Sequence, residues 1–231
     1  PYQGYAKWLK HYAKLPYPRN LYAAFLSTQD ETIGNLLATL DRLKLREDTI
    51  IVFQSDHGHS HEERAHFGGG SSGPYRGAKF SMFEGGLRVP AIISWPGKLP
   101  EGAVRDQVSH SCDWLPTLAE LAGVKLQRKD IDGLSLKNVI KNEDALTPHK
   151  VLHWQIGRGN NPRWAVREGD WKLLGNPQDT SNKAPLTTKD KLFLTNLKEN
   201  VNEMVNLAKK LPDVTQRLKK LHDEWAAKNV K

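Results

Sequence analysis

The sequence predicts an α/β domain followed by a smaller α+β subdomain. Residues 1–147 carry helical and short apolar patterns in the order helix, strand, strand, helix, which is typical of α/β domains. After about Thr147 the pattern changes to short aromatic and β-branched runs separated by Gly, Asn and Pro, which indicates an antiparallel sheet. An amphipathic pattern then closes the chain. We therefore place the boundary between residues 147 and 148.

Four elements are expected in the first part. Residues 20–44 have apolar side chains three or four positions apart, which predicts a helix. The unbroken apolar run at 50–54 predicts a strand buried on both faces of a parallel sheet. "PAIISWPG" (90–97) predicts a second strand that ends in a Pro-Gly turn. Residues 109–124 predict a helix capped by Gly123.

The second part, residues 148–231, is expected to hold an antiparallel sheet covered by a long helix. Four short runs predict its strands: 150–156, 163–168, 170–176 and 191–197. The helix should span residues 211–229, because large apolar residues recur there on one helical face. That face consists of Leu211, Val214, Leu218, Leu221 and Trp225.

The composition is that of an ordered globular protein. The chain has 231 residues, of which 38% are hydrophobic and 26% charged, so it is not of a disordered class. No apolar run reaches the roughly 18–20 residues of a membrane span, and no nucleic-acid-binding motif accompanies the net charge of +8. The single cysteine, Cys112, excludes an internal disulfide, and we expect it to be buried in its helix.

Possible ligands follow the first predicted strand directly. Asp56 and His57 lie at its carboxyl end, where open α/β sheets bind ligands. A carboxylate and an imidazole side by side could reach one cation, although the same pair could simply cap a turn. His59, His61 and His66 add to the group, but histidines beside glutamates are also common on surfaces.

A glycine-rich segment comes next and carries two cations, Arg76 and Lys79. It lacks the G-x-x-x-x-G-K-[ST] pattern of a phosphate-binding P-loop. Positive side chains near a metal suit a tetrahedral oxyanion such as sulfate or phosphate. The segment therefore favours an oxyanion site over a nucleotide site.

Three blocks of the chain strongly resemble the type I sulfatase family of the alkaline-phosphatase superfamily. They read "IIVFQSDHGHS", "GPYRGAKFSMFEGGLRVPAIISWPG" and "DWLPTLAELAGV". The tail "REGDWKLL…LFLTNLKENVNEMVNLA" is similar to the family's C-terminal subdomain. The resemblance implies that residues 1–147 are the C-terminal part of a catalytic domain, whose mixed sheet is sandwiched by helices.

The resemblance also implies roles for individual residues. Asp56 and His57 match a pair that binds a calcium ion, with His where the family more usually has Asn. Lys79 matches a catalytic lysine that contacts sulfate and stabilises the leaving group. We expect His59, His61 and Arg76 to bind substrate; if Arg76 is instead a surface charge, its loss should cost little turnover.

The block that carries Lys79 matches the family at four more residues, which we expect to be structural. They are Glu84, Gly85, Gly86 and Arg88, and the two glycines would permit a turn with positive φ.

Three features of the family pattern lack a match. We expect the formylglycine, which the family makes at a Cys/Ser-x-Pro-x-Arg motif, to lie outside this chain: Cys112 does not fit the motif, and the one literal match, "SGPYR" (72–76), falls inside the block that carries Lys79. An early Asp-Asp pair and the histidine of the family's middle region have no match either. The chain therefore looks like the C-terminal half of a sulfatase, inactive by itself, and both the formylglycine and the N-terminal half would come from a segment not in this chain. The family implies a periplasmic or secreted location, although no leader segment opens the chain.

The function expected from these observations is sulfuric ester hydrolysis. The substrate would be a sulfated carbohydrate or an aryl sulfate, and neither nucleic acid nor membrane is expected as a partner. Two alternatives stay open: a phosphate or phosphonate ester hydrolase of the same superfamily, and a non-catalytic fragment that binds sulfated glycans. The nucleophile in the missing segment would separate sulfatase from phosphatase, because an unmodified Thr or Ser favours the latter.

Overall fold

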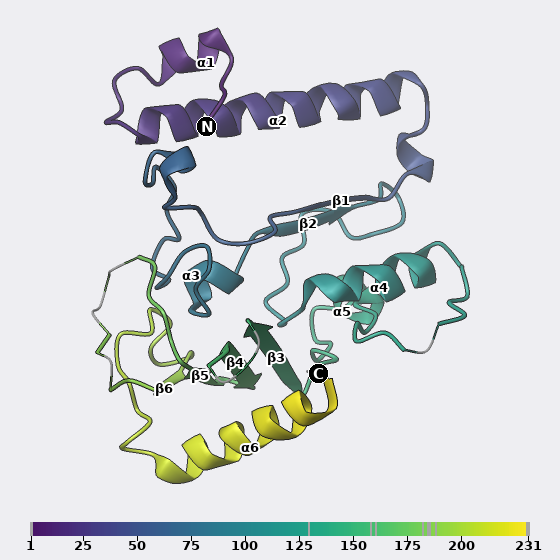
Figure 1. Ribbon diagram of the computed structural model, residues 1–231. Coiled ribbons are helices and arrows are strands. Elements are labelled where there is room, and N and C mark those ends of the chain that lie inside the picture. The colour runs from purple at the N-terminus through teal and green to yellow at the C-terminus, as the bar shows by residue number, and fades with distance from the viewer. Residues whose placement is uncertain are drawn as a thin grey trace. The chain divides into compact units, whose positions relative to one another are not determined.

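A computed structural model describes residues 2–128, 130–157, 159, 161–181, 183, 186–187 and 189–229. The chain divides into two compact units (Figure 1): Pro1–Leu36 with Gln54–Pro90 and Val151–Lys231, and Leu37–Phe53 with Ala91–Lys150. Residues 151–231 thus share a unit with 54–90, the segment that holds the expected site. The boundary at 147/148 stays a prediction. Among the described residues, no helix is both long and apolar enough to cross a membrane.

The helix, strand, strand and helix expected in the first part are all present. The described residues also form three short α-helices of six residues or fewer, which the sequence patterns did not predict. The elements are α1 (Ala6–His11), α2 (Arg19–Arg42), β1 (Ile51–Gln54), α3 (Glu84–Leu87), β2 (Ala91–Ser94), α4 (Trp114–Leu121) and α5 (Lys137–Lys141). Gly123 follows α4 with φ of 70°, as expected of a glycine after a helix end.

The first strand is less buried than its sequence predicts. β1 and β2 form a two-stranded sheet, and all four residues of β1 stay partly exposed. The expectation of a strand buried on both faces is therefore wrong for the described residues. The physical reason is the small sheet, which leaves the side chains of Ile51, Val52 and Phe53 incompletely covered.

A buried carboxylate organises the start of α4. Asp113 is fully buried and accepts hydrogen bonds from the backbone N–H groups of His110 (2.7 Å) and Leu134 (2.9 Å). Its carboxylate also lies 2.8 Å from His149 Nε2. Asp113 thus ties the helix to a distant loop, whereas the neighbouring Cys112 is exposed. The expectation of a buried cysteine is wrong because the core position beside it belongs to Asp113.

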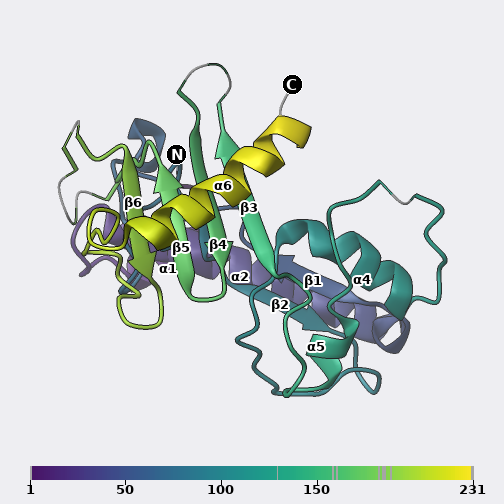
Figure 2. The same ribbon diagram turned by 90° about the horizontal axis from the view of Figure 1, so that it is seen from below.

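The second part contains the antiparallel sheet that the sequence predicts. Its strands follow one another in the order β3-β4-β5-β6, with each neighbouring pair antiparallel. The bounds are β3 (Val151–Ile156), β4 (Arg163–Glu168), β5 (Trp171–Gly175) and β6 (Leu192–Asn196). The long helix α6 spans Pro212–Asn229, and Figure 2 shows it lying across the strands on one face of this sheet.

The helix α6 packs through the apolar face that the sequence predicts. Leu218 is fully buried in a cluster with residues of β4, β5 and β6. Leu211, Val214 and Leu221 pack against the same cluster. Trp225 stacks on His153 of β3, with ring centroids 5.0 Å apart. Burial lowers the pKa of His153 to about 4, so its ring is neutral in this stack at neutral pH.

The opposite face of the sheet covers the segment that carries Lys79. Met82 and Phe83 form a second cluster with Ala165, Leu174 and Phe193. Figure 1 shows α3 on one side of the strands and α6 on the other. Because both faces are covered, consecutive residues of β4, β5 and β6 are buried rather than every second one.

Three buried charges join α3 to this sheet. Lys172 of β5 is fully buried, and its Nζ lies 2.7 Å from Glu84 Oε1 and 3.2 Å from Glu203 Oε1. The backbone N–H of Glu84 also donates to the Glu203 carboxylate. Arg167 lies 3.7 Å from the second oxygen of Glu84. We call Glu84, Lys172 and Glu203 the buried ion cluster.

The two carboxyl groups of the cluster differ in their preferred charge state. Burial alone would raise the pKa of Glu84, but Lys172, Arg167 and Arg88 outweigh it and hold that pKa below its usual value. Burial raises the pKa of Glu203, and Lys172 offsets this only in part. The Lys172 ammonium thus pairs chiefly with the Glu84 carboxylate, which limits the unpaired charge in the interior.

The Leu218→Asp substitution should destabilise the protein strongly. It removes a fully buried apolar side chain, whose burial contributes about 1.5–3 kcal/mol, and places a charge in the cluster beneath α6. Thermal unfolding checks this. Gln216→Asp, on the exposed side of α6, is the control and should change the free energy of unfolding by less than about 0.5 kcal/mol. Equal unfolding temperatures for the two variants would contradict this packing.

Lys172→Met should lower the free energy of unfolding by about 3–5 kcal/mol, the usual cost of removing one partner of a buried ion pair. The reason is that Glu84 would keep a buried charge without its ammonium. Adding Glu84→Gln to Lys172→Met should recover part of the loss, as measured by denaturant unfolding. If the double variant were less stable than Lys172→Met, the charge pairing would not be the stabilising feature.

Candidate functional site

Asp56 and His57 lie just beyond the end of β1. The Asp56 side chain is 82% exposed, and its Oδ2 lies 3.0 Å from His57 Nε2. Its Oδ1 accepts the backbone N–H of His57 at 3.0 Å. The carboxylate is therefore held beside the imidazole while one face of the pair stays open.

The orientation of the His57 ring suits a cation ligand. Its Nδ1 lies 2.8 Å from the backbone carbonyl oxygen of Gly58, which requires an N–H on Nδ1. Nε2 lies 3.0 Å from Asp56 Oδ2, and because a carboxylate oxygen only accepts, this contact needs a proton or a cation between the two atoms. Metal-binding histidines commonly donate their other N–H to a backbone carbonyl in this way.

Asp56 and His57 offer two possible metal ligands, and the described residues do not complete a metal site around them. No group of three or more His, Cys, Asp or Glu side chains among the described residues could hold a metal ion. The Asp56 carboxylate offers the oxygen that calcium prefers, whereas imidazole is more usual with transition metals. The chemistry of the pair is thus compatible with two ligands of a cation, and further ligands would have to come from other residues.

Close backbone packing joins the Asp56–His57 turn to α3. The backbone N–H of Gly58 donates to the Gly86 carbonyl at 3.1 Å, and a Cβ on Gly58 would lie 1.9 Å from the Gly85 oxygen. A Cβ on Gly85 or Gly86 would meet carbonyl oxygens at 2.3 and 2.2 Å. Both glycines lie within α3. The expectation that they adopt positive φ is wrong, and the physical requirement is close backbone approach.

Lys79 lies against the same turn. Its backbone N–H donates to the His59 carbonyl at 2.9 Å, so residues 76–83, which we call the Lys79 loop, are hydrogen-bonded to the segment that follows β1. The side chain is only 13% exposed, and its Nζ lies 2.5 Å from Glu62 Oε2. The ammonium also lies 4.9 Å from the centre of the Phe80 ring. The structure thus brings Lys79 together with the turn that carries Asp56 and His57.

The histidines of the segment form separate contacts. His59 and His61 face each other, with 2.8 Å between their Nε2 atoms. Burial, followed by the charges of His61, Lys183 and Arg19, lowers the pKa of His59 to about 4. His66 pairs instead with the Tyr17 hydroxyl, 2.8 Å from its Nδ1. Of these three histidines, His59 is the one whose backbone is shown in contact with Lys79, and the role of His59 and His61 toward substrate stays a prediction.

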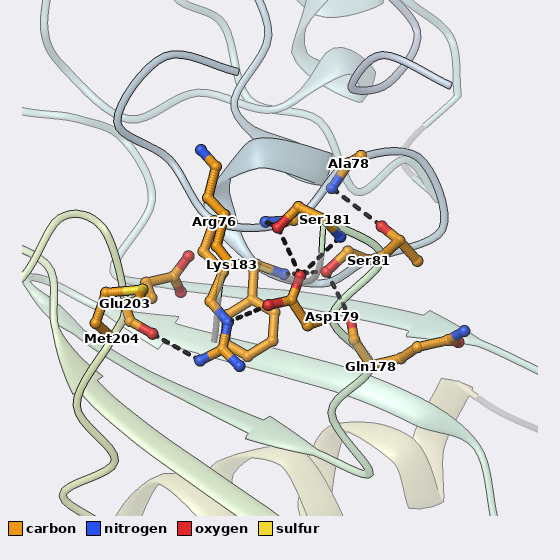
Figure 3. Close-up of polar contacts among 12 residues, drawn as sticks. Arg76, Ala78, Ser81, Gln178, Asp179, Ser181, Lys183, Glu203 and Met204 are labelled. Carbon is orange, nitrogen blue, oxygen red and sulfur yellow. Dashed lines mark hydrogen bonds and ion pairs between the residues drawn. The ribbon is translucent and has the colours of Figure 1, made fainter. Parts of the chain in front are cut away.

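Arg76 is buried rather than a surface charge. The side chain is 1% exposed, and its Nε donates to Asp179 Oδ2 at 2.7 Å. Its NH1 donates to the Glu203 carbonyl at 2.9 Å (Figure 3). Its guanidinium lies 4.1 Å from the Phe83 ring centre. The suggestion that Arg76 is a surface charge is wrong, because this side chain anchors the loop. Its predicted contact with substrate gains no support from this position.

Residues 178–181 hold the Lys79 loop and were missed by the sequence patterns. Ser181 Oγ accepts the backbone N–H of Gly77 at 2.9 Å, and Thr180 Oγ1 accepts that of Ala78 at 3.1 Å. Ser81 Oγ donates to the Gln178 carbonyl at 2.8 Å (Figure 3). The only sequence signal was a run of short polar side chains, which is also typical of any exposed loop.

Comparisons with known proteins match the whole length of the chain. The sequence model of the family described as Sulfatase matches residues 1–124. The model described as N-sulphoglucosamine sulphohydrolase, C-terminal, matches residues 76–230. The two matches overlap over residues 76–124, and this overlap begins with the Lys79 loop.

Several curated proteins and solved structures are similar to this chain. Human (Homo sapiens) steryl-sulfatase is 36% identical over 161 residues, 67% of this chain and 28% of that protein. Choline-sulfatase of Rhizobium meliloti (strain 1021) is 34% identical, with 82% of this chain and 35% of that protein covered. The crystal structure of Ps i-CgsB matches with a TM-score of 0.81 and 25% identity, over 98% of this chain and 47% of that one.

The chain therefore spans about a third of the length of these curated relatives. A family model that matches residues 1–124, more than half of the chain, carries the assignment. The Asp56–His57 turn and the Lys79 loop both lie within that match. On this evidence the chain belongs to the sulfatase family.

Proposed function

We propose that this chain forms part of an enzyme that hydrolyses sulfate esters. One observation supports the proposal most directly: the Lys79 loop is hydrogen-bonded to the turn that follows β1, through Lys79 N–H and the His59 carbonyl. A cationic donor and an open carboxylate–imidazole pair thereby belong to one local structure. The family membership supports sulfate ester chemistry for such a structure over an unrelated anion site.

In this proposal Lys79 stabilises the leaving group. Breaking the S–O bond moves negative charge onto the bridging oxygen, and a fixed ammonium near that oxygen favours the transition state over the ground state. The Lys79 side chain is mostly buried, so water screens its charge less than on an open surface. Its loop is anchored at Arg76 and at Glu84, so little reorganisation is needed during reaction.

Asp56 and His57 would hold a calcium ion together with ligands from outside this chain. The exposed carboxylate and the orientation of the imidazole are what support this part of the proposal. Bound calcium would hold sulfate oxygens and withdraw charge from them. The nucleophile, a formylglycine, would come from an N-terminal half of the sulfatase.

The substrate would be a sulfated small molecule or glycan, and the location periplasmic or secreted. BT4656, a structural relative with a TM-score of 0.65, was solved in complex with its substrate D-glucosamine-2-N,6-O-disulfate. This relative and the match to an N-sulphoglucosamine sulphohydrolase model favour a sulfated sugar. His59 and His61, beside the Lys79 loop, are the candidates for contact with it.

Lys79→Ala should lower the turnover of an aryl sulfate by about 10²–10³-fold, the typical loss for one transition-state donor. The assay uses the full-length polypeptide that contains this chain. Lys98→Ala removes an exposed lysine and should leave turnover unchanged. Near-normal turnover in Lys79→Ala would remove the proposed role, and hydrolysis of an aryl phosphate in place of the aryl sulfate would favour the phosphatase alternative.

Asp56→Asn should abolish most of the stabilisation that calcium gives to the full-length polypeptide. A cation that binds only the folded state raises the unfolding temperature, and this substitution removes a charged oxygen ligand. Because Asp56 is exposed, the variant should fold normally without calcium. Asp30→Asn, another exposed aspartate, is the matched control. An unchanged calcium response in Asp56→Asn would assign the metal to other residues.

A further inference from the structure

Glu62 is the carboxylate that contacts Lys79, and neither the sequence motifs nor the family blocks single it out. Its Oε2 lies 2.5 Å from Lys79 Nζ. The same oxygen accepts the Ser60 hydroxyl at 3.0 Å and the Arg64 NH2 group at 3.0 Å. The Glu62 backbone N–H in turn donates to Ser60 Oγ at 3.1 Å. Local hydrogen bonds thus fix the carboxylate before any contact with Lys79.

Glu62 is charged wherever the enzyme would work. The hydrogen bonds from Lys79 and then from Arg64 lower the pKa of its carboxyl to about 2. A partly exposed carboxylate therefore faces the mostly buried Lys79 side chain. Charge-assisted hydrogen bonds of this kind are short and orient both partners.

From this geometry we infer that Glu62 is a positioning residue, which aims the Lys79 ammonium at the bridging oxygen of the sulfate ester. The inference rests on the proposed function and adds a residue to it. Glu62 touches Lys79 rather than the reacting atoms, so it acts through the lysine.

The chemistry of the ammonium explains why a positioning residue is needed. A lysine side chain has a flexible four-carbon stem and a compact point charge, so by itself it does not hold one direction. The ammonium has three N–H donors, and the contact with Glu62 uses one of them. The remaining donors are then directed away from Glu62. Holding this direction in advance lowers the cost of aligning the donor in the transition state.

The opposite role for Glu62 is inhibition of the reaction, and experiment separates the two roles. A carboxylate so close to the lysine could compete with the substrate for the ammonium. Removing the charge would then speed the reaction or tighten substrate binding. A positioning role predicts the reverse, with slower turnover and little change in KM, because orientation matters most in the transition state.

A double-mutant cycle tests the pairing in the full-length polypeptide with aryl sulfates. Glu62→Gln should lower kcat by about 10–100-fold, the range expected for losing one charged hydrogen bond. In a Lys79→Ala background the same substitution should cost almost nothing further. Additive losses would overturn the inference, because they would mean that Glu62 acts independently of Lys79. An increase in rate in Glu62→Gln would also overturn it.

A leaving-group series separates positioning from a merely structural effect. Both Glu62→Gln and Lys79→Ala should slow aryl sulfates with poor leaving groups more than those with good ones, because the ammonium stabilises charge on the leaving oxygen. Glu62→Asp should restore part of the rate. Glu63→Gln, on the exposed neighbouring residue, is the matched control and should behave as the wild type. Equal slowing of all leaving groups in Glu62→Gln would contradict positioning.

Chemical labelling keeps this inference distinct from the proposed function. If the wild type fails to hydrolyse any sulfate ester, the proposed function fails, yet the pairing can still be measured. Competitive acetylation with mass spectrometry should label Lys79 several-fold faster in Glu62→Gln than in the wild type or in Glu63→Gln. Equal labelling in all three proteins would show that Glu62 does not hold Lys79, and would overturn the inference whatever the activity.

Discussion

The buried ion cluster is the constraint on which the rest of the site depends. Lys172 holds Glu84 at the start of α3, and this fixes α3 against the antiparallel sheet. The Gly86 carbonyl of α3 then accepts a hydrogen bond from the backbone N–H of Gly58. Gly58 lies two residues after Asp56. The position of Asp56 and His57 therefore depends on Lys172, which lies 116 residues after Asp56 in the sequence.

A second anchor acts on the other end of the same loop. Arg76 pairs with Asp179, and residues 178–181 take up the hydrogen bonds of the backbone that follows it. Lys79 lies between these two anchors, so its backbone is held on both sides by the second part of the chain. The C-terminal sheet is thus a structural support of the site. This agrees with the overlap of the two family matches over residues 76–124.

The charges around Lys79 partly offset one another, unlike those of the chain as a whole. Glu62 offsets part of the positive charge of Lys79 and Arg64, while His59 stays neutral at neutral pH because burial and nearby cations lower its pKa to about 4. The net charge of +8 is therefore not concentrated at the site. The electrostatic environment of Lys79 therefore depends on the charges of its neighbours rather than on the net charge of the chain.

The sequence by itself determined the order and type of the main elements, the packing face of α6 and the family, because apolar periodicity and short motifs are local properties of the chain. Only the tertiary structure decided that Arg76 is buried, that Gly85 and Gly86 serve close packing, and that Glu62 and residues 178–181 hold the Lys79 loop. Burial and pairing depend on which distant side chains come into contact. The sequence around Arg76 does not show whether its side chain faces solvent or pairs with Asp179, which lies 103 positions away.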